Sequence, residues 1–322
     1  MSIRFVVFVA SMAIVSCGAP PEAPSPDADA ELTGAEAAAS AERLPEQIVA
    51  QRDGFIPEGV EYDMTNGRLL TGSLSEGSIF HIAADGSVTP IISDPELVSS
   101  VGIEVDELRG RLLVANADRA VFDGGTTGQA MLGVYDLNSG ERIAMVDLAA
   151  TVPQGDDTAF FANDVAVADD GTAYVTDTRL NVIYRVDTQY QASLFHRFED
   201  GEAGPNGIVE HPSGYLLVAR GAELWKVPTD DTGAAAPVTL PEDIPGQDGM
   251  VWSAGRLAIV SNSTNRVVAL TSGDEWATAQ LDGIARYEPQ ATTAAVVGDD
   301  VYVVHPMFSG DGPPSFSRVS FE

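Results

Sequence analysis

The sequence is poor in cysteine and in positive charge, and each shortage excludes a class of protein. It has one cysteine in 322 residues, so no internal disulfide can form and a zinc site built from cysteines is excluded. Lysine and arginine number 17 against 48 aspartates and glutamates, which gives a formal net charge of −31. Because nucleic acids bind through clustered basic side chains, we expect no nucleic-acid partner. The same charge opposes adsorption to an anionic lipid surface.

Several motifs of well-known catalytic sites are also missing. The chain has no glycine-rich phosphate loop, no Gly-x-Ser-x-Gly turn and no His-Glu-x-x-His segment. Its apolar content of 44% is too high for a disordered protein. The sequence therefore predicts a folded, acidic protein whose chemistry rests on another arrangement of side chains.

The N-terminus has the pattern of an export signal. Arg4 precedes an apolar run from Phe5 to Val15, which suits a signal peptide and is too short to span a bilayer, for which about 20 residues are needed. The run ends in Ile14-Val15-Ser16-Cys17, which resembles the lipobox of bacterial lipoproteins. This resemblance implies that residues 1–16 are removed and that Cys17, the only cysteine, is lipidated. The alternative is an ordinary secretory signal with an incidental cysteine.

The segment that follows, 17–42, reads as a tether. Beyond Cys17 it is rich in alanine, proline and acidic residues and has no lysine or arginine. Such a composition cannot bury enough apolar surface to order itself, so we expect a flexible acidic linker. A short alanine-rich helix near Gly34 to Ala41 is the alternative. The expected location is the cell envelope, either the periplasmic side of the outer membrane or the cell surface, with membrane contact through the Cys17 lipid alone.

From residue 43 to the C-terminus the chain repeats. Short β-type runs alternate with Gly, Asp and Asn, and no helical period is sustained. The repeat openings begin at Glu58, Val101, Asn163, Asn206 and Asp248, so they are spaced by 43, 62, 43 and 42 residues. A sixth, less regular unit centres on residues 301–304. Units of this length with four short strands are propeller blades, so residues 43–322 are predicted to form an all-β, six-bladed β-propeller, which we expect to be a monomer.

Closure of the ring also follows from the sequence. The sixth unit has only three expected strands, near residues 292–297, 301–305 and 316–321, before the chain stops. A spare β-type run lies ahead of the first blade, from Glu46 to Ala50. We predict that this run forms the outer strand of blade six, with a disordered N-terminal arm as the alternative.

The openings carry the candidate metal ligands. In a propeller the inner strand of every blade starts at the same face of the central channel, so the opening residues converge on the axis. Four of the openings offer side-chain oxygens, and none of them is histidine or cysteine: Glu58, Asn163, Asn206 and Asp248. Oxygen ligands of this kind suit Ca²⁺, with Zn²⁺ or Mg²⁺ as alternatives. The competing interpretation is that Asn-Gly and Asp-Gly are ordinary turn dipeptides.

These openings resemble those of the gluconolactonase, regucalcin (senescence marker protein) and luciferin-regenerating-enzyme family. The resemblance lies in Glu58-Gly59, Asn163-Asp164-Val165, Asn206-Gly207 and Asp248-Gly249-Met250. It implies that Glu58, Asn163, Asn206 and Asp248 bind one divalent cation and that a lactone or ester is hydrolysed. It also implies that Asp248 touches both the cation and the attacking water, as the base.

Further candidates come from the second strand of each blade, which returns to the same face. Fourteen residues after three of the openings stand Asp177, Arg220 and Asn262, which we predict to bind substrate around the channel mouth. His305 holds the matching place in blade six and is a second candidate for the general base. The alternative for His305 is a solvent-exposed rim position.

Two insertions account for the long interval between the second and third openings. They cover Asp118 to Gln129 and Thr151 to Phe161, and both are expected on the metal face, as a lid or as variable surface loops. The leading hypothesis is a lipid-anchored, metal-dependent hydrolase of a lactone or ester. The alternatives are a non-catalytic calcium-binding propeller that serves as an envelope scaffold, and a binding or sensing protein.

Overall fold

The structure is a computed structural model that describes residues 43–155, 158–199, 201, 203–308 and 312–322. The predicted signal peptide (1–16), Cys17 and the tether (17–42) lie outside the described residues. One compact unit spans Leu44–Glu322. Among the described residues, no helix has the length and apolar character needed to cross a bilayer.

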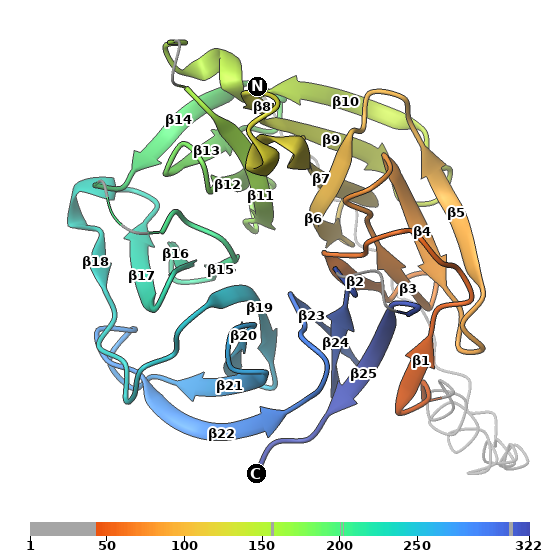
Figure 1. Ribbon diagram of the computed structural model, residues 1–322. Coiled ribbons are helices and arrows are strands. Elements are labelled where there is room, and N and C mark those ends of the chain that lie inside the picture. The colour runs from red at the N-terminus through yellow and green to blue at the C-terminus, as the bar shows by residue number, and fades with distance from the viewer. Residues whose placement is uncertain (1–42, 156–157, 200, 202, 309–311) are drawn as a thin grey trace, which may run out of the picture. The chain divides into compact units, whose positions relative to one another are not determined.

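Six small sheets follow one another around a central axis, which confirms the predicted six-bladed propeller (Figure 1). Blade one consists of β2 (Val60–Asp63), β3 (Arg68–Thr71), β4 (Ser78–Ile82) and β5 (Val88–Ser93). Blade two consists of β6 (Ser99–Asp106), β7 (Arg111–Ala117), β9 (Met131–Asp136) and β10 (Arg142–Asp147). Blade three consists of β11 (Phe160–Val167), β12 (Ala173–Asp177), β13 (Val182–Val186) and β14 (Ala192–Arg197), and the short strand β8 (Gly128–Gln129) pairs parallel with β11. Three 3₁₀ turns complete the described elements: η1 (Arg119–Asp123), η2 (Ala149–Thr151) and η3 (Thr232–Ala234).

Blades four to six follow the same order from the axis outward. Blade four consists of β15 (Ile208–His211), β16 (Tyr215–Arg220), β17 (Glu223–Pro228) and β18 (Ala236–Pro237). Blade five consists of β19 (Gln247–Ser253), β20 (Arg256–Ser261), β21 (Arg266–Thr271) and β22 (Gln280–Arg286). Blade six consists of β23 (Ala294–Val297), β24 (Asp300–His305), β25 (Ser315–Val319) and β1 (Gln47–Val49). Within each blade, consecutive strands pair antiparallel.

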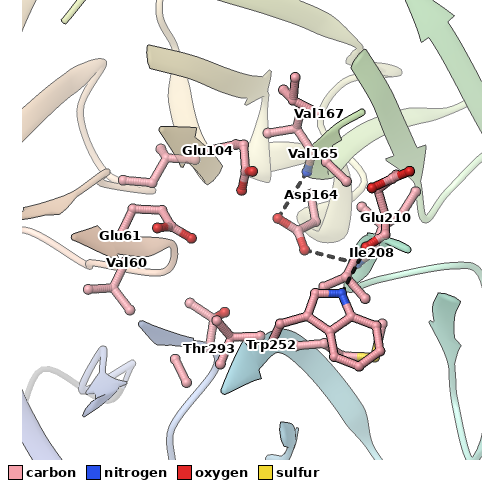
Figure 2. A pocket seen from close by; sticks show the side chains of 16 residues that line it. Val60, Glu61, Glu104, Asp164, Val165, Val167, Ile208, Glu210, Trp252 and Thr293 are labelled. Atoms are coloured by element: carbon pink, nitrogen blue, oxygen red, sulfur yellow. Dashed lines mark hydrogen bonds between the residues drawn. The ribbon is translucent and has the colours of Figure 1, made fainter. Parts of the chain in front are cut away.

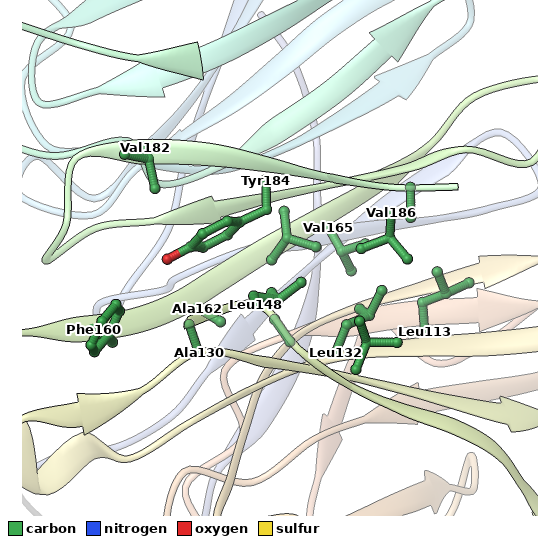
Figure 3. Close-up of a cluster of buried hydrophobic side chains, with 14 of the residues drawn as sticks. Leu113, Ala130, Leu132, Leu148, Phe160, Ala162, Val165, Val182, Tyr184 and Val186 are labelled. Carbon is green, nitrogen blue, oxygen red and sulfur yellow. The ribbon is translucent and has the colours of Figure 1, made fainter. Parts of the chain in front are cut away.

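The hydrophobic core is divided among the interfaces between neighbouring blades. Figure 3 shows one such cluster, in which Leu113 and Leu132 of blade two pack against Val165 and Tyr184 of blade three. Comparable clusters fill the other interfaces, including the one between blade six and blade one. Because every blade is buried on both faces by its neighbours, the second strands, such as β7 and β12, are buried along their whole length.

The predicted closing strand is present. β1 pairs antiparallel with β25 through Ile48 and Phe316, and the Ile48 side chain is 1% exposed in the cluster between blades six and one. The chain therefore enters the ring as the outer strand of the last blade before it builds the first.

The glycines of the repeat openings serve close approach between blades. A side chain on Gly207 would collide with the carbonyl oxygen of Asp248, and one on Gly249 with Thr293 of the next blade. Neither glycine has a left-handed φ, and Gly249 lies within β19. Hence the Asp248-Gly249 dipeptide is strand, not turn, and the glycine lets neighbouring inner strands meet near the axis.

Replacing Gly249 by alanine should therefore lower the free energy of unfolding by about 1–3 kcal/mol, because a methyl group has no space at this contact. Chemical denaturation measures the difference. Gly273→Ala is the matched control, since no atom lies within 4 Å of the position of its added carbon. Equal effects of the two substitutions would contradict the close-approach explanation.

Candidate functional site

Asp248 lies at the centre of a buried polar group at the end of the channel where the inner strands begin. It belongs to β19 and is 4% exposed. The Nδ2 atom of Asn262, just beyond β20, donates a hydrogen bond of 2.6 Å to Asp248 Oδ2, and the Asn206 side chain also bonds to this carboxylate. Burial raises the pKa of Asp248 to about 7, although the two amides act in the opposite direction. Three residues from blades four and five therefore meet at one carboxylate.

Glu58 brings a second carboxylate from blade one. It is 9% exposed, and among the described residues no group donates a hydrogen bond to its side chain. Burial raises its pKa well above the ordinary value, and the nearby carboxylates of Asp248 and Asp164 raise it further. The Glu58 oxygens are not among the fully buried side-chain atoms that lack a partner, so a ligand in the channel can reach them, and a cation there would offset the cost of ionising this carboxylate.

Asn163 joins the group from blade three. It is 6% exposed in β11, and its Nδ2 donates to Thr178 Oγ1 at 2.8 Å. The Thr178 hydroxyl in turn donates to the carbonyl oxygen of Pro205, next to Asn206. The blade-three and blade-four openings are thus connected through one threonine.

The donor set fits a hard cation. Glu58 and Asp248 supply two carboxylates whose pKa values are both raised, and the asparagines supply amide oxygens. Within the described part of the chain, no three His, Cys, Asp or Glu side chains form a metal cluster. A cation here would therefore have to take amide oxygens besides the two carboxylates, which is chemistry that Ca²⁺ accepts.

A second layer of carboxylates lines the channel beneath the openings, and the sequence analysis missed it. Figure 2 shows Glu61, Glu104 and Asp164 directed into a cavity of about 290 Å³. Asp164 is fixed by the backbone N–H groups of Val165 and Ile208, at 2.9 and 3.1 Å, so it also ties blade three to blade four. The other two carboxylates accept no such cross-blade bonds from the described residues.

Burial dominates the protonation of this layer. It raises the pKa of Glu61 to about 8 and that of Asp164 to about 7, and it raises the pKa of Glu104 well above the ordinary value. Repulsion from Asp164 contributes to the shift at both glutamates. Without a bound cation, part of the channel is therefore neutral at pH 7.

The three predicted substrate contacts have different surroundings. Asp177 is fully buried, and its carboxylate accepts hydrogen bonds from the backbone of Phe161, Arg179 and Leu180 and from the Tyr184 hydroxyl. This carboxylate supports a turn and does not face a substrate, so we leave Asp177 out of the proposed contacts.

Arg220 is also engaged within the protein. It donates to the carbonyl oxygen of Glu199, lies over the Phe198 ring and is 3.7 Å from the Glu223 carboxylate. Asn262, the third predicted contact, lines a crevice of about 590 Å³.

His305 is neither at the rim nor in contact with solvent. Its ring is 0% exposed, its Nδ1 lies 3.3 Å from the carbonyl oxygen of Gln290, and its Nε2 has no partner among the described residues. The Tyr287 ring meets it edge-on, with centroids 5.7 Å apart. Burial lowers the pKa of His305, so the ring is neutral at pH 7. Such a position gives the ring no direct access to a substrate.

The first insertion packs onto the opening of blade two. Val121 of η1 joins Val101 and Phe161 in a small apolar cluster, which explains why this opening carries valine and no polar ligand. Phe122, the next residue of η1, is 57% exposed and lines the same crevice as Asn262. Part of the insertion is therefore a wall of the crevice. The second insertion is described only in part, because residues 156 and 157 lie outside the described residues.

Comparisons with known proteins identify the fold and no family. The sequence matches no family model and no curated protein. The structure is similar to the Malassezia sympodialis allergen Mala s 1, with a TM-score of 0.72 and 17% identity over 86% of this chain and 97% of that one. It is also similar to the calcium-binding protein regucalcin from Agrobacterium tumefaciens (TM-score 0.59, 17% identity, 86% and 95% covered) and to a putative gluconolactonase (0.57, 15%, 87% and 94%). The chain thus shares the six-bladed fold that the sequence resemblance implied.

Proposed function

We propose that this protein is a hydrolase that opens a lactone or cleaves an ester with the help of one divalent cation, most simply Ca²⁺. The observation that supports the proposal is Glu58, a buried carboxylate without a hydrogen-bond donor beside the second buried carboxylate of Asp248. A cation held by Glu58, Asn163, Asn206 and Asp248 would balance both charges. The calcium-binding and gluconolactonase neighbours of the same fold are consistent with this chemistry.

The residues of the proposed site have two roles: they bind the cation and position the base, and they transfer a proton. A bound divalent cation supplies polarisation of the substrate carbonyl and orientation of water. Asp248 takes the proton of the attacking water as the new C–O bond forms, and the proton passes to the departing alkoxide as the ester bond breaks. Asn262 and Asn206 hold the Asp248 carboxylate in place through their hydrogen bonds. The buried ring of His305 does not reach this space, so we assign the base to Asp248 alone.

We further propose that the enzyme is exported and anchored by a lipid on Cys17. The lipobox-like Ile14-Val15-Ser16-Cys17 supports this location. Radiolabelled palmitate in cells should label the protein, and Cys17→Ala should prevent the labelling.

The test of the activity is a panel of lactones and aryl esters, assayed with Ca²⁺, with Zn²⁺ and with a chelator. Turnover should require the cation, and Asp248→Ala should lower kcat/KM at least about 100-fold, because both a ligand and the base are removed. Asp299→Asn, which changes an exposed acid in a turn, is the control and should keep full activity.

A second candidate, a non-catalytic propeller whose cation only plugs the channel, is favoured by the deep burial of Glu58 and Asp248. It predicts calcium binding that raises the melting temperature together with no turnover on any substrate of the panel. Cation-dependent turnover that survives Asp248→Ala would contradict the mechanism proposed for Asp248.

A further inference from the structure

The crevice beside Asp248 is also lined by Arg179, which the proposed function does not use. Its volume is about 590 Å³, and its lining includes Asn262 and Asn206, both bonded to Asp248, together with Gln247, Phe122 and Arg179. The crevice is therefore lined both by residues of the proposed reaction centre and by an arginine. The volume is in the range of pockets that hold small molecules.

Arg179 is held in place from two sides. Its backbone N–H donates to the buried Asp177 carboxylate at 3.0 Å, which fixes the turn between β12 and β13. Its guanidinium lies over the Phe122 ring, 5.7 Å from the centroid. Phe122 in turn meets Phe161 edge-on at 4.8 Å, and Phe161 is 5% exposed in the core. A cation stacked on a supported aromatic ring is preorganised to bind an anion.

The charge of Arg179 is not neutralised within the described part of the chain. Nine arginines there have a carboxylate within 4.0 Å, as Arg220 has Glu223, and Arg179 is not among them. Arg179 thus places an arginine without a carboxylate partner in the lining of this crevice, in a protein with a net charge of −31. The side chain is exposed, so a ligand can reach it.

Gln247 also lines the crevice, and its side-chain amide is buried. It is 3% exposed, and its Nε2 donates to the carbonyl oxygen of Ala222 at 2.9 Å. This bond directs Oε1 elsewhere, and Oε1 has no donor among the described residues. Because this oxygen is buried, a ligand in the crevice does not reach it, and Gln247 is not assigned a contact with the substrate.

We propose that the substrate is anionic: a lactone or ester that also carries a carboxylate, which Arg179 binds in the crevice beside Asp248. This inference rests on the proposed function for the reacting bond. The carboxylate itself takes no part in the reaction; it sets the orientation of the carbonyl toward Asp248. A guanidinium binds a carboxylate through two parallel hydrogen bonds, which favours a charged substrate over a neutral one of the same shape.

The experiment compares two probes that differ only in charge: γ-butyrolactone with a carboxylate on C5, and the same lactone with a carboxamide. The carboxylate should have about a tenfold lower KM than the carboxamide, with similar kcat. Arg179→Gln should remove most of this difference by raising KM for the carboxylate alone, and Arg179→Lys should retain part of it. Arg286→Gln, an exposed arginine far along the chain with the same change in net charge, should leave the preference intact.

A binding measurement separates this inference from the proposed hydrolysis. Tetrahydrofuran-2-carboxylate and its carboxamide cannot be hydrolysed as lactones, and their affinities are measured by calorimetry with Ca²⁺ present. Tighter binding of the carboxylate that is lost in Arg179→Gln supports the inference even if no lactone is turned over. Turnover without charge preference leaves the proposed function standing and overturns the inference. The inference is also overturned if Arg179→Gln still prefers the carboxylate, as it would if the carboxylate bound the cation directly. It is overturned as well if neither compound binds.

Discussion

Replacing Glu61 by glutamine should stabilise the cation-free protein at pH 9 and leave its stability unchanged at pH 4. Burial raises the pKa of Glu61 to about 8, whereas an unfolded chain keeps the ordinary value near 4.3. Glu61 is protonated in both states at pH 4, so it has no electrostatic cost there. Between about pH 4.3 and pH 8 the unfolded chain releases this proton while the folded protein keeps it, so stability falls as the pH rises through that range, and the full loss is present above pH 8.

The expected gain for Glu61→Gln at pH 9 is about 1–3 kcal/mol, since glutamine has the same shape and no charge to bury. Repulsion from Glu61 is the largest contribution to the raised pKa of Glu104 after burial itself, so the substitution also relieves a neighbour. Urea unfolding with chelator present, at pH 4 and at pH 9, measures the difference between the two variants. Glu141→Gln, at an exposed position, is the control and should show no pH-dependent gain. A gain of equal size at both pH values would show that shape and not charge is responsible.

The fold was predictable because the repeat in the sequence reflects a contact that every blade must make. Gly207 and Gly249 occur at the openings because a side chain there would collide with the next inner strand. The number of residues between such glycines therefore equals the length of one blade. The closing strand was predictable because the sequence of blade six contains only three strands. A further β-type segment, which includes Ile48, precedes blade one and supplies the fourth strand.

The site was predictable only where its geometry follows from the repeat. The openings meet because all inner strands begin at one face, and Asp248 and Asn206 do bond to each other. The rule that the second strand returns to this face predicted Asn262 at the channel mouth, and the structure has it hydrogen-bonded to Asp248; its role in substrate binding stays a prediction. The same rule could not tell that the Asp177 carboxylate is occupied by the turn that follows it, because those donors are backbone groups of ordinary residues.

Two further features depended on contacts that local patterns do not contain. His305 is buried beneath Tyr287 and the segment at Gln290, which the chain places there through the packing of blade five against blade six. The pattern of the openings does not identify Glu61 and Glu104 as channel residues, because each lies three residues beyond an opening. The strand register shifts at several openings, between Ser100 and Ile103 for example, so simple alternation from the opening does not identify the residues that face the axis.

Removing β1 should have the largest effect on stability of any local change. We expect a chain that begins at residue 43 to fold, and one that begins at residue 51 to be largely unfolded or aggregated. The shorter chain loses the Ile48 side chain from the core and the pairing of β1 with β25. It also loses the carbonyl acceptor of the Tyr302 hydroxyl, at Leu44. Together these losses amount to about 5 kcal/mol, which is comparable to the whole stability of a typical domain.

A point substitution tests the same strand without shortening the chain. Ile48→Ala should lower the free energy of unfolding by about 2–5 kcal/mol, because it leaves a cavity between blades six and one. Val49→Ala, at a neighbouring position that is 45% exposed, should change it by less than about 0.5 kcal/mol. Thermal and urea unfolding measure both variants. Blade six closes the ring against blade one, and β1 is its outer strand. If Ile48→Ala left the stability unchanged, β23, β24 and β25 alone would be sufficient to close the propeller. The strand β1 would then add no stability to the ring.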